Sequence, residues 1–227
     1  DGTIRVFDFS SINLNDRDLK FAVASCMTVD DKNLAIGQTI WPELLSHKPD
    51  MVFLIGDSVY TDIDRKTLQV DVLVTPEDLW KRHAEARFLL PIYRQKKLTP
   101  IIAVWDDHDY GQNNGDKSYR FKNESAQIFN DFFAQDRTKG FVRGPGVSSF
   151  FKAAKQNFVF LDDRSFRTEN NNDDEKQTHW GAKQENWLLK ILNISRRPTW
   201  IFNGDQIWAD YHDFESYKIN HPKSFEK

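Results

Sequence analysis

The sequence predicts an α/β fold of layered sheets and helices, because strand-like and helix-like segments alternate along it. Five short runs rich in β-branched and aromatic residues have the composition of buried strands. They are residues 21–25, 51–55, 101–105, 158–161 and 199–202. Four longer segments between them carry apolar residues near helical spacing. They are residues 36–46, 76–93, 124–133 and 181–192.

Local signals refine several of these elements. Thr75-Pro76-Glu77-Asp78 offers a capping hydroxyl, a proline for the first turn and acidic side chains near the positive end of the helix dipole. A helix is therefore predicted to begin there. Residues 148–152 and 158–161 are joined by a short polar link and can form an antiparallel hairpin, so we expect mixed sheets. The polar run 169–175 predicts a solvated loop.

The composition excludes several classes of protein. The 227 residues are 14% aromatic, which argues against a disordered chain. No apolar run approaches the ~18 residues of a membrane span. A net charge of −3 without a basic block weighs against nucleic acid as the main partner. The single cysteine, Cys26, rules out an internal disulfide framework and a cysteine-rich zinc site.

Acidic residues follow four of the predicted strands at the point where each strand ends. They lie in Gly56-Asp57, Asp106-Asp107-His108-Asp109, Asp162-Asp163 and Gly204-Asp205. The carboxyl ends of the strands in an open α/β sheet converge on the ligand crevice. Carboxylates gathered there repel one another unless a cation joins them, so the pattern predicts a metal site.

Each of these residues also has a structural interpretation. The acids of residues 106–109 can be solvated in a capped turn, where Asp106 and Asp109 cap the turn or orient the neighbouring histidine. Cys26 can be a small buried hydrophobe and Tyr60 can simply pack. Acidic residues directly after two consecutive predicted strands nevertheless favour the metal site.

Four motifs occur in one order along the chain. They are FAVASC at residues 21–26, GDSVY at 56–60, WDDHD at 105–109 with NNGDK at 113–117, and LDDRSFR at 161–167. A later run, QENWLL at 184–189, resembles a glutamine–tryptophan helix. The ordered set resembles the alkaline phosphatase D (PhoD-like) family of metallophosphatases, over roughly residues 21 to 211.

The resemblance implies a four-layer α/β/β/α metallophosphatase sandwich with mixed sheets and a two-metal centre between the sheet edges. Asp57 matches the carboxylate that bridges the metals, and Cys26 and Tyr60 match a thiolate and a phenolate on a ferric ion (Fe3+). Asp107 matches a ligand of the second metal, which is implied to be calcium (Ca2+), and His108 matches the imidazole that contacts the phosphoryl oxygens. Ferric iron favours anionic donors and calcium takes several oxygen ligands, so the residue types suit both ions.

One part of the family's pattern, a late Gly-Asp-x-His motif, has no counterpart here. Residues 203–206 carry no histidine at the expected place, and His212 is expected to be a surface or packing residue. We therefore expect residues 1–20 to be an N-terminal extension or edge segment, and residues 21–227 to be a PhoD-like domain that is incomplete at its C-terminus. The natural protein is expected to continue beyond Lys227, and a shortened sandwich would leave an apolar edge uncovered.

The predicted function is the metal-dependent hydrolysis of phosphate esters, as in an alkaline phosphatase or phosphodiesterase, by a metal-activated hydroxide. His108 and Asp57 are the predicted catalytic residues. Two alternatives stay open: a non-catalytic remnant of the fold that binds metal or phosphate, and an ordinary α/β hydrolase-like domain whose acids are solvated turns. The expected partners are a small phosphorylated substrate and the missing C-terminal part of the fold, without nucleic acid or a membrane span. The resemblance also implies an exported protein.

Overall fold

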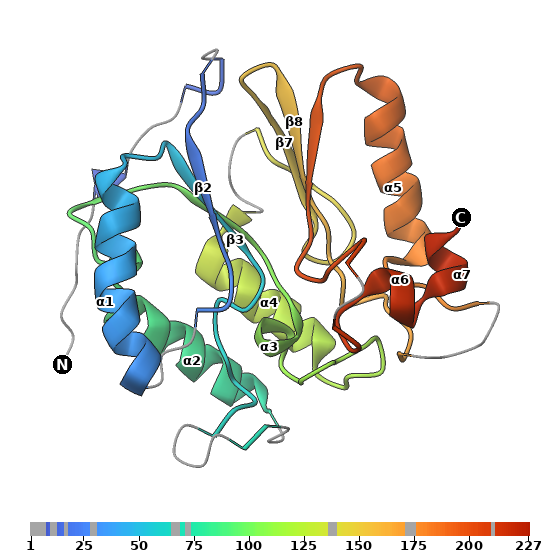
Figure 1. The fold of residues 1–227 in the computed structure, drawn as a ribbon, viewed down its shortest axis with the longest axis horizontal. Coiled ribbons are helices and arrows are strands. Elements are labelled where there is room, and N and C mark those ends of the chain that lie inside the picture. The colour runs from blue at the N-terminus through green and yellow to red at the C-terminus, as the bar shows by residue number, and fades with distance from the viewer. Residues whose placement is uncertain are drawn as a thin grey trace.

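The computed structural model has four layers, in the order helix, sheet, sheet, helix (Figure 1). Helices α1 (Asp31–Ser46) and α2 (Pro76–Leu89) flank one sheet, and α5 (Gly181–Ile194) covers the outer face of the other. The predicted α/β/β/α sandwich is thus confirmed. The structure describes residues 8–9, 13–15, 18–27, 31–64, 69–70, 74–135, 140–170, 176–209 and 212–227, with backbone alone for 31–34.

The first sheet is entirely parallel and has its most buried strand in the middle. Its order is β2 (Phe21–Ala24), β3 (Met51–Ile55) and β5 (Ile101–Val104). The connections through α1 and α2 return the chain to the same end of the sheet each time. All three strands therefore end at one edge, which is the edge where the sequence places the acids of residues 57 and 106–109.

The second sheet is mixed, as the hairpin pattern predicts. β6 (Val142–Arg143), β7 (Ser149–Ala153) and β8 (Gln156–Phe160) are antiparallel neighbours, and β9 (Thr199–Phe202) pairs with β8 in parallel after the α5 crossover. A separate parallel pair joins β1 (Asp8–Phe9) to β4 (Lys97–Leu98).

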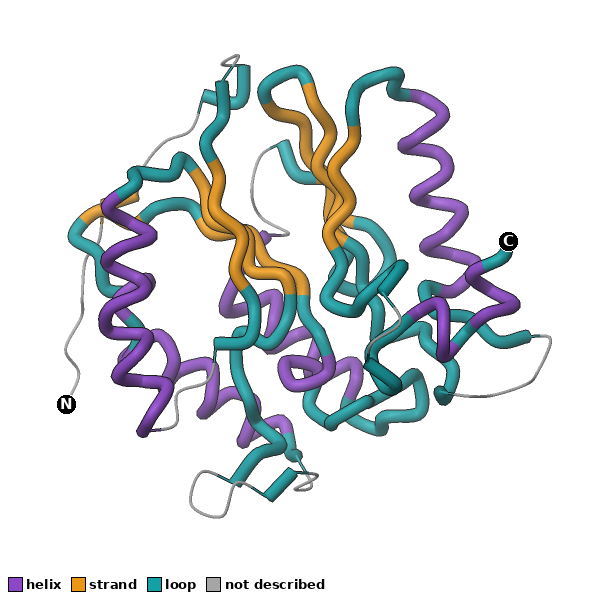
Figure 2. The backbone as a smooth tube through the Cα atoms, in the orientation of Figure 1, coloured by secondary structure: helices purple, strands orange, loops and turns teal. Residues whose placement is uncertain are grey.

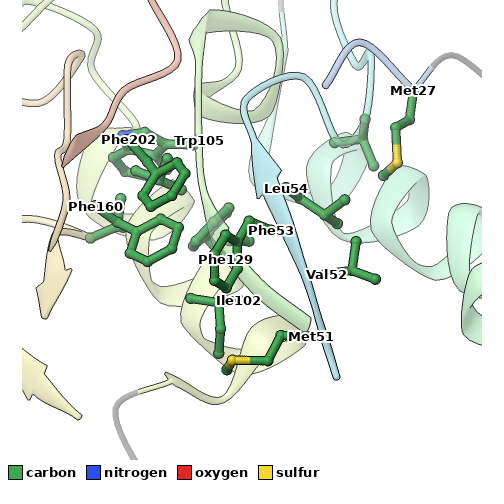
Figure 3. Close-up of a cluster of buried hydrophobic side chains, with 14 of the residues drawn as sticks. Met27, Met51, Val52, Phe53, Leu54, Ile102, Trp105, Phe129, Phe160 and Phe202 are labelled. Carbon is green, nitrogen blue, oxygen red and sulfur yellow. The ribbon is translucent and has the colours of Figure 1, made fainter. Parts of the chain in front are cut away.

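The two sheets are held face to face by aromatic side chains. Phe53 on β3 has no exposed surface and contacts rings of the second sheet, with centroids 5.2 Å from Phe160 and 5.0 Å from Phe202. These rings meet edge to face, the arrangement that the charge distribution of aromatic rings favours. Figure 3 shows Phe53, Trp105 and Phe129 in one continuous cluster with the second-sheet phenylalanines.

The ends of the predicted helices are set by caps and by proline. At the start of α2 the Thr75 hydroxyl accepts from the Asp78 amide at 3.3 Å, and the Asp78 carboxylate accepts from the Thr75 amide at 3.0 Å. The predicted helix 76–93 is shorter than expected and ends at Leu89. Leu90 is extended because it precedes Pro91, which begins a separate 3-10 turn (Pro91–Tyr93).

The remaining helices are shorter than α1, α2 and α5. They are α3 (Asp107–Tyr110), α4 (Lys122–Phe133), α6 (Tyr217–Asn220) and α7 (Pro222–Phe225). None of the helices in the described ranges is long and apolar enough to cross a membrane. The predicted loop 169–175 lies largely outside the described residues, and the division at residue 20 stays a prediction.

Two buried histidines anchor the C-terminal helices. His179 stacks on Tyr217 with ring centroids 4.3 Å apart, and His221 Nε2 lies 2.9 Å from the Thr168 carbonyl. Burial disfavours the charged rings, so the pKa of His179 lies well below its usual value and the pKa of His221 falls to about 4. Both side chains are therefore neutral in the folded protein near pH 7.

We expect Phe53→Ala to lower the free energy of unfolding by about 3–5 kcal/mol, since it empties space between the sheets. Phe88→Ala is the matched control, because that ring is 60% exposed, and should change stability by about 0.5 kcal/mol or less. Urea unfolding measures both. Equal effects of the two variants would contradict the central role given to Phe53.

The two buried imidazoles contribute stability that is lost as the pH drops from about 6.5 to about 4, because the unfolded chain takes up protons that the folded imidazoles do not. The loss from His221 is on the order of 2–3 kcal/mol, and the buried acids with raised pKa values act in the opposite direction. Between pH 7 and pH 4.5, His221→Gln should therefore lose less stability, or gain more, than the parent, measured by urea unfolding, whereas the exposed His47→Gln should follow the parent. An unaltered slope in His221→Gln would refute this assignment.

Candidate metal centre

The carboxyl ends of the parallel strands are joined by backbone hydrogen bonds that continue past the sheet. The Cys26 amide donates to the Gly56 carbonyl at 3.3 Å, and the Gly56 amide donates to the Val104 carbonyl at 2.9 Å. Figure 2 shows the three strands ending together, with loops and α3 gathered below them. Side chains of the loops after β2, β3 and β5 are thereby brought to one place.

The backbone at this edge is held in unusual conformations. Cys26 and Asp57 have φ angles of 58° and 52°, in the left-handed region that residues other than glycine rarely adopt. Gly56 has a φ of 99°, and a Cβ there would lie 2.7 Å from Asp106 Cβ. Glycine at this position lets the loop after β3 touch the loop after β5. Strained positions of this kind gather at functional sites.

Among the residues that the structure describes, one group can hold a metal ion. The ligand atoms of Asp57, Asp107 and His108 lie within 4.8 Å of one another, and all three side chains are buried. Asp57 Oδ1 is buried without any hydrogen-bond partner. An orphaned carboxylate oxygen costs free energy unless something binds it, so the donor set fits a cation.

The other two predicted ligands, Cys26 and Tyr60, lie on the opposite oxygen of Asp57. The Tyr60 hydroxyl donates to Asp57 Oδ2 at 3.0 Å, and Cys26 Sγ lies 3.7 Å from the same atom. Burial and the negative charge of Asp57 raise the pKa of both groups, so each remains protonated unless a cation is bound. Oδ2 of Asp57 thus has two partners, whereas Oδ1 has none.

Negative charges converge on the Asp57 carboxyl. Burial raises its pKa well above the ordinary value, and the charges of Asp106 and Asp107 add to the effect. Burial acts in the same direction on Asp107, but it is outweighed by the Arg164 charge, the His108 charge and amide donors. Those donors are the amides of Asn114 at 2.7 Å and His108 at 2.9 Å, so the pKa of Asp107 is lowered. Asp107 is therefore the better anion of the pair.

His108 is fixed by a carboxylate that the sequence analysis did not single out. His108 Nδ1 lies 2.6 Å from Oδ1 of Asp62, which is fully buried. Burial by itself would lower the pKa of His108, but the Asp62 bond and the charges of Asp107 and Asp57 outweigh it and raise the pKa to about 9. A carboxylate on one ring nitrogen fixes the orientation of the other, Nε2.

The outer acids of the 106–109 motif are structural and buried. Asp109 accepts from the Ser58 hydroxyl, from the Val59 amide at 3.2 Å and from the Asp106 amide at 3.1 Å. Asp109 therefore caps α3 and ties it to the loop after β3, one of the two roles expected for it. The alternative of solvated acids is wrong, because Asp106, Asp107 and Asp109 are at most 5% exposed.

A buried arginine lies behind this edge. Arg164 has no exposed surface, and its Nε donates to Asp106 Oδ1 at 2.6 Å. It also lies 3.9 Å from both Asp163 and Asp205. The sequence marked Arg164 only through its place in the LDDRSFR motif. Its partner Asp106 lies 58 residues away along the chain and could not be predicted from the motif.

The C-terminal histidines stay away from the metal cluster. Asp205 forms an ion pair with Arg167 Nη1 at 2.5 Å, and His179 Nε2 lies 3.6 Å from the same Asp205 carboxylate. His212 is 45% exposed and lies 3.8 Å from Glu215, which agrees with the expectation of a surface residue. The structure brings the predicted site residues together at this edge. They are Cys26, Asp57, Tyr60, Asp107 and His108.

Comparisons with known proteins bear on the sequence and the fold of the whole chain. No protein-family model matches the chain. It is 25% identical over 209 residues to alkaline phosphatase D of Bacillus subtilis (strain 168), covering 78% of this chain and 35% of that protein. A solved structure of PhoD superposes with a TM-score of 0.67 at 19% identity, covering 93% of this chain and 48% of that chain.

The chain therefore spans about a third of the length of the curated relative and about half of the solved structure. The chain is similar in sequence to alkaline phosphatase D, and its α/β fold matches that of PhoD.

Proposed function

We propose that this chain carries the metal centre of a phosphoesterase that hydrolyses phosphate esters. The observation that carries the proposal is the buried group Asp57, Asp107 and His108, with one Asp57 oxygen left without a partner. The similarity to alkaline phosphatase D supports this choice of reaction. Because the chain covers about a third of that relative, the activity of the whole protein is part of the proposal.

The residues present suit two different ions. Cys26 and Tyr60, together with Asp57 Oδ2, offer a thiolate, a phenolate and a carboxylate, which ferric iron favours. Asp107 and the other oxygen of Asp57 offer the hard oxygen donors that calcium takes. Metals held by these residues would supply a hydroxide nucleophile and would offset charge on the phosphoryl oxygens.

The protein side chains around the metals perform positioning and proton transfer. Asp57 holds its two oxygens toward both donor sets, and Tyr60 keeps its ring 4.2 Å from that of His108. His108, kept protonated by Asp62, presents Nε2 as a donor to a phosphoryl or leaving-group oxygen. The Asp62 bond makes this donor rigid before the substrate arrives, so little reorganisation is needed.

The substrate and the location of the protein are further parts of this proposal. A metal cluster that acts on phosphate esters implies a small phosphorylated substrate. Export from the cytoplasm is proposed through the likeness to alkaline phosphatase D. The non-catalytic alternative from the sequence has no observation that favours it, and turnover measurements distinguish it from hydrolysis.

Asp57→Asn should lower the rate of phosphate release from an aryl phosphate by about a hundredfold or more, because the neutral amide loses the charge and one of the two oxygens that would hold a cation. The bound metal, measured by elemental analysis, should fall in parallel, and chelation should abolish the activity of the unmodified protein. Asp131→Asn, on the exposed face of α4, is the matched control and should behave like the parent. An unchanged rate in Asp57→Asn would remove this carboxylate from the mechanism.

Asp62→Asn should lower the pKa of His108 from about 9, because it removes the carboxylate that stabilises the protonated ring. The alkaline limb of the pH–rate profile should then move to lower pH, since the proton donor is lost earlier as the pH rises. Metal content should stay close to that of the parent. A profile that does not move, at unchanged metal content, would show that His108 is not the donor.

A further inference from the structure

An apolar cavity of about 270 Å³ lies between β2 and α1, next to the metal centre. Apart from Ser25 and Cys26, the described residues that line it are apolar, and none of them is charged. Its walls come from the end of β2, from one face of α1 and from the residue that follows α2. We call this cavity the apolar pocket. The argument below uses five of its lining residues, Cys26, Gly37, Ile40, Trp41 and Leu90.

The apolar pocket shares a residue with the metal centre. Cys26 lines the pocket, and its Sγ lies 3.7 Å from Oδ2 of Asp57. The next residue, Met27, also lines the pocket, and its amide donates to the Asp57 carbonyl at 2.7 Å. The segment that follows β2 therefore forms one side of both sites. A ligand bound at the metal centre can extend past Cys26 into the pocket.

Glycine at position 37 leaves space in the pocket. Gly37 lies inside α1, where glycine is a less favourable residue than alanine. A Cβ there would lie 3.5 Å from Leu90 Cδ2 and 3.6 Å from Trp41 Cδ1, which is ordinary van der Waals contact. These contacts would admit a side chain, so they do not account for the glycine. A longer side chain at this position would occupy the space between Leu90 and Trp41.

The rim of the pocket favours an apolar ligand. Ile36 and Ile40, one turn apart on α1, and Val23 on β2 all line the pocket and are exposed. Each CH₂ group that a ligand buries against such side chains strengthens binding about threefold to fourfold. A charged group placed there would lose its hydration without gaining a charged partner among the described lining residues.

We propose that the apolar pocket binds the alkyl or aryl group of a phosphate ester whose phosphoryl group lies at the metal centre. This inference rests on the proposed phosphoesterase function and adds the class of substrate, an ester of an apolar alcohol. A cavity of about 150 Å³ is enough to hold benzene. The apolar pocket, at about 270 Å³, therefore has room for one ring or a short alkyl chain.

Calorimetric titration of the metal-loaded chain with methylphosphonate and with phenylphosphonate tests the proposal. Both compounds carry a carbon–phosphorus bond in place of the ester bond, so binding is measured without turnover. Phenylphosphonate should bind at least about tenfold more tightly than methylphosphonate, because its ring reaches the pocket. Equal affinities for the two compounds, or binding of neither, would overturn the proposal.

Gly37→Leu is the decisive variant, because the leucine side chain would fill the space between Leu90 and Trp41 and suits a helix better than glycine. Phenylphosphonate should lose its roughly tenfold advantage, whereas methylphosphonate should bind as it does to the parent. Ala35→Leu, at an exposed position of α1 that does not line the pocket, is the matched control and should keep the parent's preference. A preference for the ring that survives in Gly37→Leu would show that the ring lies elsewhere.

Ile40→Ala is a second variant, which shortens an exposed side chain at the rim. It should weaken phenylphosphonate binding about threefold or more, and Ile194→Ala, exposed on α5, should have no effect. Equal effects of these two variants would contradict the proposal.

Hydrolysis of an aryl phosphate by the parent, measured in parallel, separates this proposal from the proposed function. A preference for the ring that is lost in Gly37→Leu, in a parent without turnover, would support the pocket and count against the phosphoesterase alone. Turnover without any preference for the ring would count against the pocket alone.

Discussion

Repulsion between buried carboxylates is the constraint around which this structure is organised. Asp57, Asp106 and Asp107 end or follow neighbouring strands and have almost no access to water. Arg164, buried behind them, offsets the charge of Asp106 directly and lowers the pKa of Asp107. It does not satisfy Asp57, which keeps a raised pKa and an oxygen without a partner. Arg164 thus offsets part of the negative charge at this edge, and the Asp57 carboxylate remains available to bind a cation from solution.

Hydrogen-bond satisfaction separates structural acids from candidate ligands. Asp109 and Asp162 accept several bonds from backbone and side-chain donors within the fold. Among the residues that the structure describes, the side-chain partners of the Asp57 carboxylate are Tyr60 and Cys26, both of which have the donor atoms of metal ligands. Buried acids in this protein therefore have two different roles, as structural hydrogen-bond acceptors and as candidate metal ligands. The distinction rests on which oxygen atoms remain available, and not on how acidic the surrounding segment is.

Most of the elements and several residues of the candidate site could be predicted from local features of the sequence. Periodicity located strands 51–55 and 199–202, and Thr75 marked the start of α2, because caps and buried runs are local properties. The ordered motifs also named Asp57 and Asp107, since acids that leave adjacent parallel strands must meet.

The partners of those residues could not be predicted, because they come from distant parts of the chain. The Asp62–His108 bond joins positions 46 residues apart, and Arg164 reaches Asp106 across 58 residues. No periodicity encodes such pairs. The Asp62–His108 bond depends on how the loops after β3 and β5 lie against each other, and the Arg164–Asp106 pair depends on how the two sheets face each other.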